Sequence, residues 1–355
     1  MAAAASPVQL CALRAIEAAR HIRAVVQRMP LAERGRTVDA ALKPGAAITL
    51  QVDRTAEDIA IAAFERLADE VGYRLHLIVD PARAQVIELG RSPQRQVIFA
   101  YLDAIDGTIK VGGLCNDVAA GKIRVASDGN WGVAAAFTEP TDRRLEQLRF
   151  ADFAGAAVLD GNPLRYRAHP EEVVAVPVDG TLASYDLSEA PAVTAALRRA
   201  PRLYTSTNEQ LQRGIVFFDA FQAFDVETRQ AGDDVIAVEL YRRLLNRHAG
   251  GAFDVVRQYG SLSALLHSLL GWRGEPPWME SQGVAFVVVN ENLANLIPAL
   301  PIVAGAGGVS VDFDGRPIGA RKLVKGRCSV IHAAGTAVCD AVLRLVAEAR
   351  ASAAT

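Results

Sequence analysis

Two aspartates stand three residues apart in the stretch Asp103-Ala104-Ile105-Asp106-Gly107-Thr108, directly after the apolar run 97–102. Their carboxylates, with the carbonyl of Ile105 between them, can supply three oxygens to a hard cation such as Mg²⁺. Gly107 allows a sharp turn, and the Thr108 hydroxyl could orient a water molecule beside the second carboxylate. Asp and Thr are also typical of a solvated loop that caps a helix, so the string alone leaves both interpretations open.

Other residues of chemical interest favour structural interpretations. His76, His267 and His332 lie in separate apolar segments without the spacing of a zinc site. Ser261 lacks the surrounding Gly residues of a nucleophilic hydrolase motif. The glycine-rich stretch 305–308 has no following Lys-Ser/Thr pair, which makes a helix stop a better interpretation than a phosphate loop.

The elements that must position the acidic motif are predicted from hydrophobic periodicity. Around the motif, the pattern predicts two helices, at 8–29 and 56–71. It also predicts strands at 47–52, 75–79, 97–102 and 131–137. A stretch rich in Pro, Gly and Asp at 159–185 suggests a crossover, and we place a boundary at Pro177. This divides the chain into a helix-plus-sheet half, 1–176, which carries the metal motif, and an α/β half, 177–355, which carries the substrate side.

The second half is predicted with the same rules. Helices are expected at 233–245, 262–270, 296–304 and 336–349, and strands at 285–289 and 309–313. A Gly307-Gly308 helix stop and an Asp314-Gly315 hairpin turn flank the second of these strands.

Composition narrows the functional classes. A chain of 355 residues is long enough to bury a sizeable core. Its formal net charge of -2 gives the chain as a whole no electrostatic attraction to nucleic acid or to an anionic membrane. The stretch 8–29 carries charged residues at regular intervals, which indicates an amphipathic helix rather than a signal peptide or a membrane span. The four cysteines are far apart, as expected of reduced thiols in a cytoplasmic protein. We therefore expect a small-molecule substrate.

The motif at 103–108 resembles the metal-binding signature of the inositol monophosphatase and fructose-1,6-bisphosphatase superfamily. Other segments follow in that family's order. Asp53 to Glu57 resembles the start of the family's second helix, and Leu77 to Asp80 lies where the family carries a metal-binding Glu after a strand. Arg257 to Ala264 resembles its Gly-Ser/Thr stretch, and Ile302 to Gly315 its closing helix, double Gly and hairpin.

This resemblance implies an α/β fold of alternating helix and sheet layers, an αβαβα sandwich, with the active site between the two halves and often a homodimer. It also implies the metal ligands. Asp80, Asp103 and the Ile105 carbonyl would hold one Mg²⁺, whereas Asp103, Asp106 and Asn295 would share a second.

The resemblance further implies the catalytic and substrate contacts. Thr108 and Asp53 would take the proton of the attacking water, and the phosphate would lie near the start of the helix that follows Thr108. Lys110 could neutralise a phosphate oxygen or supply the charge of a missing ion, although a solvated loop lysine is also consistent with its position. The substrate-binding candidates are Gly107, Thr108, Lys110, Gly260 and Ser261.

The sequence departs from the family pattern at several of these positions. Asn295 stands where a metal-binding Asp is expected, and Ala294 replaces the preceding Trp. Val288 replaces an acid that contacts substrate hydroxyls in inositol phosphatases. Asp80 is one methylene shorter than the usual Glu, and Glu88 is the alternative ligand if the register differs.

The sequence therefore predicts a metal-dependent phosphoric monoester hydrolase acting on a small phosphorylated sugar, cyclitol or nucleotide. Two alternatives remain open. In one, the loss of a charged ligand at Asn295 leaves a non-catalytic protein that binds a phosphorylated ligand or partner. In the other, Lys110 supports a different phosphate chemistry.

Overall fold

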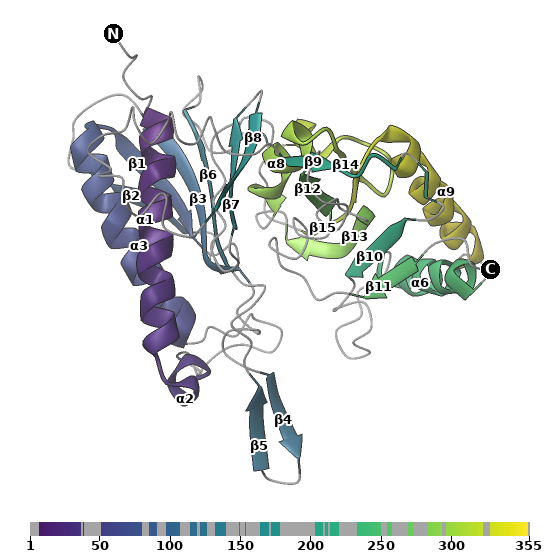
Figure 1. Ribbon diagram of the computed structural model, residues 1–355, viewed down its shortest axis with the longest axis horizontal. Coiled ribbons are helices and arrows are strands. Elements are labelled where there is room, and N and C mark those ends of the chain that lie inside the picture. Colours follow the sequence, from purple (N-terminus) through teal and green to yellow (C-terminus); the bar gives the residue numbers. More distant parts are fainter. Residues whose placement is uncertain are drawn as a thin grey trace.

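The computed structural model describes residues 7–36, 38, 51–79, 85–90, 97–106, 114–118, 121–125, 132–139, 149, 153, 164–169, 172–177, 203–208, 210–211, 214–219, 233–249, 254–257, 269–272, 283–292, 296–321 and 327–353. Within these ranges the chain forms two mixed sheets with helices packed on them (Figure 1).

The first sheet has the strand order β2-β1-β3-β6. Its strands are β1 (Arg74–Val79), β2 (Gln85–Leu89), β3 (Val97–Asp106) and β6 (Gly132–Thr138). Strands β1 and β3 run parallel, and β2 and β6 pair antiparallel with them. The helices α1 (Pro7–Arg28) and α3 (Gln51–Val71) cover one face of this sheet, and the short α2 (Leu31–Arg34) lies between them in sequence (Figure 1).

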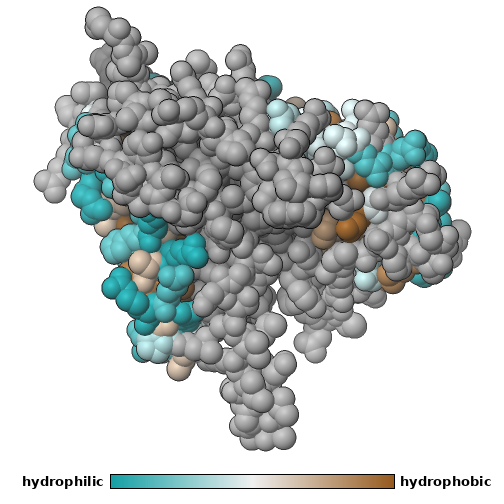
Figure 2. Space-filling model, viewed as in Figure 1, coloured by the Kyte–Doolittle hydropathy of each residue, from teal (hydrophilic) through white to brown (hydrophobic). Residues whose placement is uncertain are grey.

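Small side chains let α1 and α3 approach each other and the sheet. Ala15 and Ala19 of α1, and Ala56 and Ala60 of α3, recur at helical spacing and are all buried in one core. Larger side chains fill the remaining space, for example Phe64, whose ring centroid lies 5.6 Å from that of Phe137 on β6. Where Figure 2 colours the surface of this helical layer, hydrophilic residues predominate.

Strand β3 is buried on both faces because successive side chains belong to different cores. Ile98, Ala100 and Leu102 pack with α1 and α3. Phe99 and Tyr101, which alternate with them, belong to a cluster that also contains residues of the second half. A continuous apolar run is the expected signature of such a strand.

The second sheet has the order β11-β10-β13-β15-β14. Its strands are β10 (Ile215–Asp219), β11 (Asp254–Arg257), β13 (Gly283–Asn292), β14 (Val309–Asp312) and β15 (Arg327–Ala333). The helices α6 (Asp233–Ala249) and α9 (Thr336–Ala353) pack on one face, whereas α8 (Ala299–Gly305) lies between the two sheets (Figure 1).

Shorter elements complete the described fold. Three two-stranded pairs are β4 (Leu114–Val118) with β5 (Gly121–Val125), β7 (Leu164–His169) with β8 (Glu172–Pro177), and β9 (Leu203–Thr205) with β12 (Leu270–Trp272). A single 3₁₀ turn, η6 (Ile318–Ala320), follows β14.

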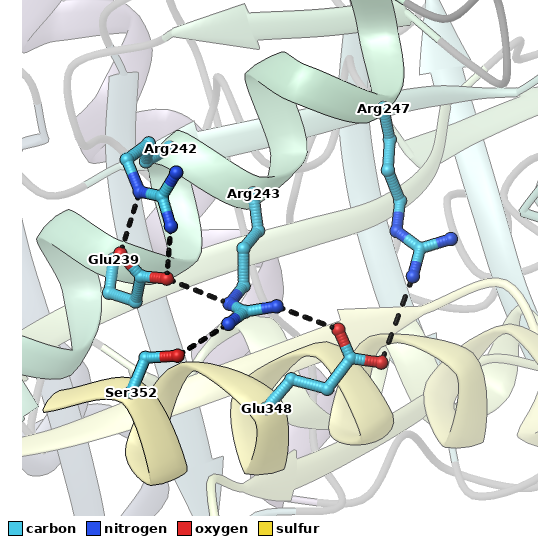
Figure 3. Close-up of polar contacts among 6 residues, drawn as sticks. All are labelled: Glu239, Arg242, Arg243, Arg247, Glu348 and Ser352. Atoms are coloured by element: carbon cyan, nitrogen blue, oxygen red, sulfur yellow. Dashed lines mark hydrogen bonds and ion pairs between the residues drawn. The ribbon is translucent and has the colours of Figure 1, made fainter. Parts of the chain in front are cut away.

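Polar side chains join α6 to α9 on the outer surface of the second half (Figure 3). Arg243 ion-pairs with Glu239 of its own helix at 2.9 Å and with Glu348 of α9 at 3.0 Å. It also donates to the Ser352 hydroxyl, and Arg247 lies 3.7 Å from Glu348. These contacts fix the two helices side by side over the second core.

The end of α8 is a double-glycine stop, as the sequence predicts. Gly307 has φ of 91°, and its N–H bonds the carbonyl of Ala304, while the N–H of Gly308 bonds that of Val303. Gly308 also has no room for a side chain, because a Cβ there would lie 2.8 Å from the carbonyl oxygen of Ala333. A Cβ there would also lie 2.8 Å from Cγ1 of Val303, so the chain passes tightly between α8 and β15 at Gly308.

Several element boundaries differ from the sequence-based expectations. Val52 was expected in a strand, but it begins the buried stripe of α3 with Ala56 and Ala60. The expected helix at 296–304 starts at Ala299, after a turn at 296–298. The expected hairpin after Asp314-Gly315 is reduced to one bridge, since β14 pairs with β15 instead.

Other predictions from the sequence agree with the structure only in part. The stretch 159–185 was expected to be a crossover, and it contains the hairpin β7–β8, which ends at Pro177. Leu270 was expected at the end of a helix but belongs to β12, and residues 258–268 lie outside the described residues. The structure confirms the expected strand at 309–313 and the expected helices at 8–29, 56–71, 233–245 and 336–349. Their ends agree to within a few residues, except that α3 begins five residues before the helix expected at 56–71.

No helix in the described part of the chain is both long and apolar enough to span a membrane.

Candidate active site

The first half of the acidic motif lies in strand β3, where an extra residue interrupts the ladder with β6. Asp103 pairs with Ala134 and Asp106 pairs with Gly132, so three steps along β3 match two steps along β6. This is a β-bulge, a feature found next to active sites where it redirects the chain. For residues 103–106, the alternative of a solvated loop capping a helix is therefore wrong.

The bulge determines which face of the sheet the two aspartate positions share. In a regular strand, residues three apart lie on opposite faces. Here Ala104 and Ile105 are both buried in the core beneath α1 and α3. Because Gly132 and Ala134 are two residues apart on a regular strand, position 106 returns to the face of Asp103. The three-residue spacing thus brings two aspartate positions to the face that is turned toward the second half.

Asp103 is held in place by its own neighbours. Its side chain is partly buried, and its Oδ1 accepts a hydrogen bond of 3.1 Å from the backbone N–H of Ile105. This bond closes a local turn of the kind that Asp favours, and it orients the carboxylate before any ligand binds. The burial of Ile105 anchors the other end of that bond.

Strand β1 ends beside β3 at the level of Leu102, the residue before Asp103. The parallel pairing of β1 with β3 ends at Val79 opposite Leu102. The next residues along the two strands are Asp80 and Asp103, and carboxyl ends of neighbouring parallel strands meet at one edge of a sheet, where ligands bind. Asp80 itself lies outside the described residues.

Glu88, the alternative ligand to Asp80, lies elsewhere. It pairs with His76 on β1, and His76 pairs with Phe99, four residues before Asp103. Four residues of strand span about 13 Å. The Glu88 carboxylate instead accepts a hydrogen bond of 3.0 Å from Arg74.

Asp53 lies in the first turn of α3, with a partly buried side chain, on the helix that packs against β3. Glu57, one turn later, is 8% exposed and lies 3.7 Å from Arg54. The sequence-based role of Asp53 as a proton acceptor remains a prediction.

His76 is the described histidine nearest in sequence to the motif. Its ring packs edge-on against Phe99 with centroids 5.0 Å apart. Burial lowers the pKa of His76, and this effect is larger than that of the negative charge of Glu88, which raises the same pKa. A neutral imidazole against an aromatic ring is consistent with a structural role.

The second half approaches Asp103 through a shared apolar cluster. Tyr101, two residues before Asp103 and on the same face, belongs to a cluster with Leu296 and Leu300 near α8 and with Cys328 and Val330 of β15. Leu296 follows Asn295 directly in the sequence, although Asn295 lies outside the described residues. The packing therefore brings the chain next to Asn295 toward the carboxyl end of β3.

The remaining predicted site residues fall in other parts of the chain. Gly107, Thr108, Lys110, Gly260 and Ser261 lie outside the described residues, as does the side chain of Asp106. In the described part of the chain no three His, Cys, Asp or Glu side chains gather closely enough to hold a metal ion. Asp103 and Ile105 are thus the described members of the proposed metal site, and a carboxylate with a neighbouring carbonyl is an oxygen donor set suited to Mg²⁺.

Solved structures of phosphatases share the fold of this chain. It aligns with a Leishmania major fructose-1,6-bisphosphatase at a TM-score of 0.62 and 12% identity, over 97% of this chain and 93% of that one. An inositol monophosphatase of Anabaena (Nostoc) sp. gives 0.56 and 12%, over 97% of both chains. An inositol monophosphatase of Thermotoga maritima gives 0.51 and 16%, over 95% of this chain and 97% of that one.

Sequence comparison alone finds neither a matching family model nor a matching curated protein. The likeness therefore concerns the fold, and it confirms the layered α/β architecture that the family resemblance implies.

Proposed function

We propose that this chain, whose fold is that of inositol monophosphatases and fructose-1,6-bisphosphatases, is a Mg²⁺-dependent phosphomonoesterase. The observation that carries the proposal is the bulge in β3, which turns the positions of Asp103 and Asp106 to one face at the carboxyl end of a parallel strand pair. The substrate class is a small phosphorylated sugar, cyclitol or nucleotide.

The metal ligands in this proposal are Asp80, Asp103 and the carbonyl of Ile105, with Asp106 and Asn295 completing a second position. When bound, Mg²⁺ supplies positive charge that stabilises the phosphoryl oxygens and activates water. Asp103 contributes a carboxylate already oriented by the Ile105 N–H, so little ordering is needed on binding. Thr108 and Asp53 orient the attacking water and accept its proton.

The phosphate-binding residues are Gly107, Thr108 and Lys110, with Gly260 and Ser261 on the other side of the substrate. Backbone N–H groups just after Thr108 would favour the phosphate charge. The longer helix that the resemblance implies after Thr108 is not formed, because strand β4 begins at Leu114. The organic part of the substrate would face the second half, where Val288 offers no acid to its hydroxyl groups. Inositol phosphate itself is therefore disfavoured.

Phosphate release from a panel of metabolite monophosphates, with Mg²⁺ and with EDTA, tests the proposal. We expect release on at least one substrate that EDTA abolishes and that Asp103→Asn reduces at least a hundredfold, with an unchanged thermal midpoint because the amide oxygen still accepts from Ile105. The absence of metal-dependent release on every substrate, together with no Mg²⁺ binding by calorimetry, would refute it.

A second candidate is a non-catalytic protein that binds a phosphorylated ligand, and the amide at Asn295 favours it because a neutral ligand holds a second ion less firmly. The variant Asn295→Asp separates the two. A large gain of phosphatase activity would indicate a protein that has lost its second ion, whereas loss of an existing activity would show that the amide is required. Turnover without metal that Lys110→Ala abolishes would instead support a lysine-based chemistry.

A further inference from the structure

Strand β13 contains a second bulge that matches the one in β3. Val288 pairs with Val330 and Glu291 pairs with Cys328, so three steps along β13 face two along β15. In both halves the bulged strand runs parallel to one neighbour and antiparallel to the next. The two sheets therefore end their long central strands with the same irregularity.

The bulge in β13 depends on an unusual backbone conformation. Asn290, within the bulge, has φ of 55°, and no other non-glycine residue among those described has a positive φ. Asn is one of the few residue types that adopt this left-handed conformation at low cost. The bulge thus depends on a residue with a specific conformation at position 290, directly before the ladder with β15 resumes at Glu291 and Asn292.

A buried hydroxyl stabilises this conformation. The backbone N–H of Asn290 donates a hydrogen bond of 3.1 Å to the Oγ of Ser329, whose side chain is 1% exposed. Asn290 stands outside the register of residue pairs between β13 and β15, as is typical of a residue in a bulge, and its N–H bonds a side chain of β15. The Ser329 hydroxyl is buried and the bond itself is partly buried, so this hydrogen bond stabilises the bulge.

The bulge is connected to the acidic motif of the first half. Cys328 and Val330, the two neighbours of Ser329, belong to the apolar cluster that contains Tyr101 of β3 and Leu296. Strand β13 ends at Asn292, and only three residues separate it from Leu296. The last of these three is Asn295, the proposed ligand from the second half.

We propose that Ser329 is a positioning residue of the site: its hydroxyl holds the left-handed turn at Asn290 and so sets the direction in which the chain leaves β13 toward Asn295. This inference rests on the proposed function, because the role of Asn295 does. Ser329 touches neither substrate nor metal in this account. It acts through the backbone of β13.

The test compares Ser329→Ala with Ser329→Thr, which keeps the hydroxyl, and with Ser310→Ala, which removes a hydroxyl from the neighbouring strand β14. The Mg²⁺ concentration for half-maximal phosphate release is expected to rise about tenfold in Ser329→Ala, as is common when a residue supporting a ligand is removed. At saturating Mg²⁺ the turnover rate should change much less. Ser329→Thr should restore the wild-type value, and Ser310→Ala should leave it unchanged.

Substitutions of Asn290 itself disturb the backbone conformation of the same turn in a second, independent way. Asn290→Val should raise the Mg²⁺ requirement, because a β-branched residue resists a positive φ. Asn290→Gly should raise it less, since glycine adopts this conformation freely. Hydrogen–deuterium exchange of residues 284–300 gives a readout without catalysis: exchange at 289–292 should be faster in Ser329→Ala and unchanged in Ser310→Ala.

These measurements distinguish failure of the proposed function from failure of the positioning role of Ser329. A wild-type protein without metal-dependent phosphate release refutes the proposed function, and the positioning role falls with it. An active wild type whose Mg²⁺ requirement is the same in Ser329→Ala refutes the positioning role alone, even if the thermal midpoint of that variant is lower.

Discussion

Burial of His332 should make the stability of this protein fall as the pH is lowered from neutral to weakly acidic. His332 lies on β15, fully buried, with its Nδ1 at 2.8 Å from the Ser310 hydroxyl. Its Nε2 has no hydrogen-bond partner among the described residues. Burial lowers the pKa of His332 from its ordinary value of 6.5 to about 3. The folded protein therefore holds this imidazole neutral over a range in which the unfolded chain protonates it.

The size of the effect follows from this difference in pKa. Between pH 6.5 and pH 3 the unfolded state binds one more proton at His332 than the folded state does, so the free energy of unfolding rises with pH. One proton corresponds to about 1.4 kcal/mol per pH unit. From pH 7.5 to pH 5, His332 should thus remove about 2 kcal/mol of stability.

Urea unfolding at pH 7.5 and pH 5 measures this difference for the wild type and for His332→Asn. The asparagine keeps a polar partner for Ser310 but does not titrate, so its stability should fall by about 2 kcal/mol less than that of the wild type over the same pH interval. Ser310→Ala is the matched control, because it removes the hydrogen bond and keeps the imidazole. Its pH dependence should equal that of the wild type. Equal pH dependence of the wild type and His332→Asn would contradict the reasoning.

Three further predictions concern packing, ion pairs and the site. Gly308→Ala should lower the free energy of unfolding by about 1–3 kcal/mol in urea titration, because its Cβ would collide with β15 and α8, whereas an unchanged midpoint would show that α8 can shift. Arg243→Ala should lower the thermal midpoint more in low salt than in high salt, since it removes the contacts to Glu348 and its neighbours, and a salt-independent effect would argue against ion pairing. Glu88→Gln should leave phosphate release unchanged, because Glu88 pairs with Arg74, and a large loss would return Glu88 to the list of ligands.

The helices of this fold follow from local patterns in the sequence, and several strands do not. The apolar stripes of α1 and α9 repeat at helical spacing, which is a local signal. Strand β15 is buried on both faces and includes His332 and Ser329, so it shows neither alternation nor a continuous apolar run. The expected strand around Val52 failed because a short apolar run has no period that distinguishes a strand from the start of a helix.

The acidic motif could be found from the sequence, whereas its geometry could not. The string from Asp103 to Thr108 indicates oxygen ligands by residue type alone. The shared face of positions 103 and 106 arises from pairing with β6, a partner about thirty residues away, so no local rule predicts the bulge. The hydroxyl of Ser329 at Asn290 is likewise a contact between strands far apart in the chain.

The most direct test of the central claim is a crystal soaked with Mn²⁺ and phosphate, with data collected at the manganese absorption edge. We expect an anomalous peak within about 2.3 Å of an Asp103 carboxylate oxygen, with the phosphate beside it. Asp103→Asn should weaken or remove that peak. A phosphate bound without any ion near Asp103, or an ion at a place remote from the bulge in β3, would contradict the claim.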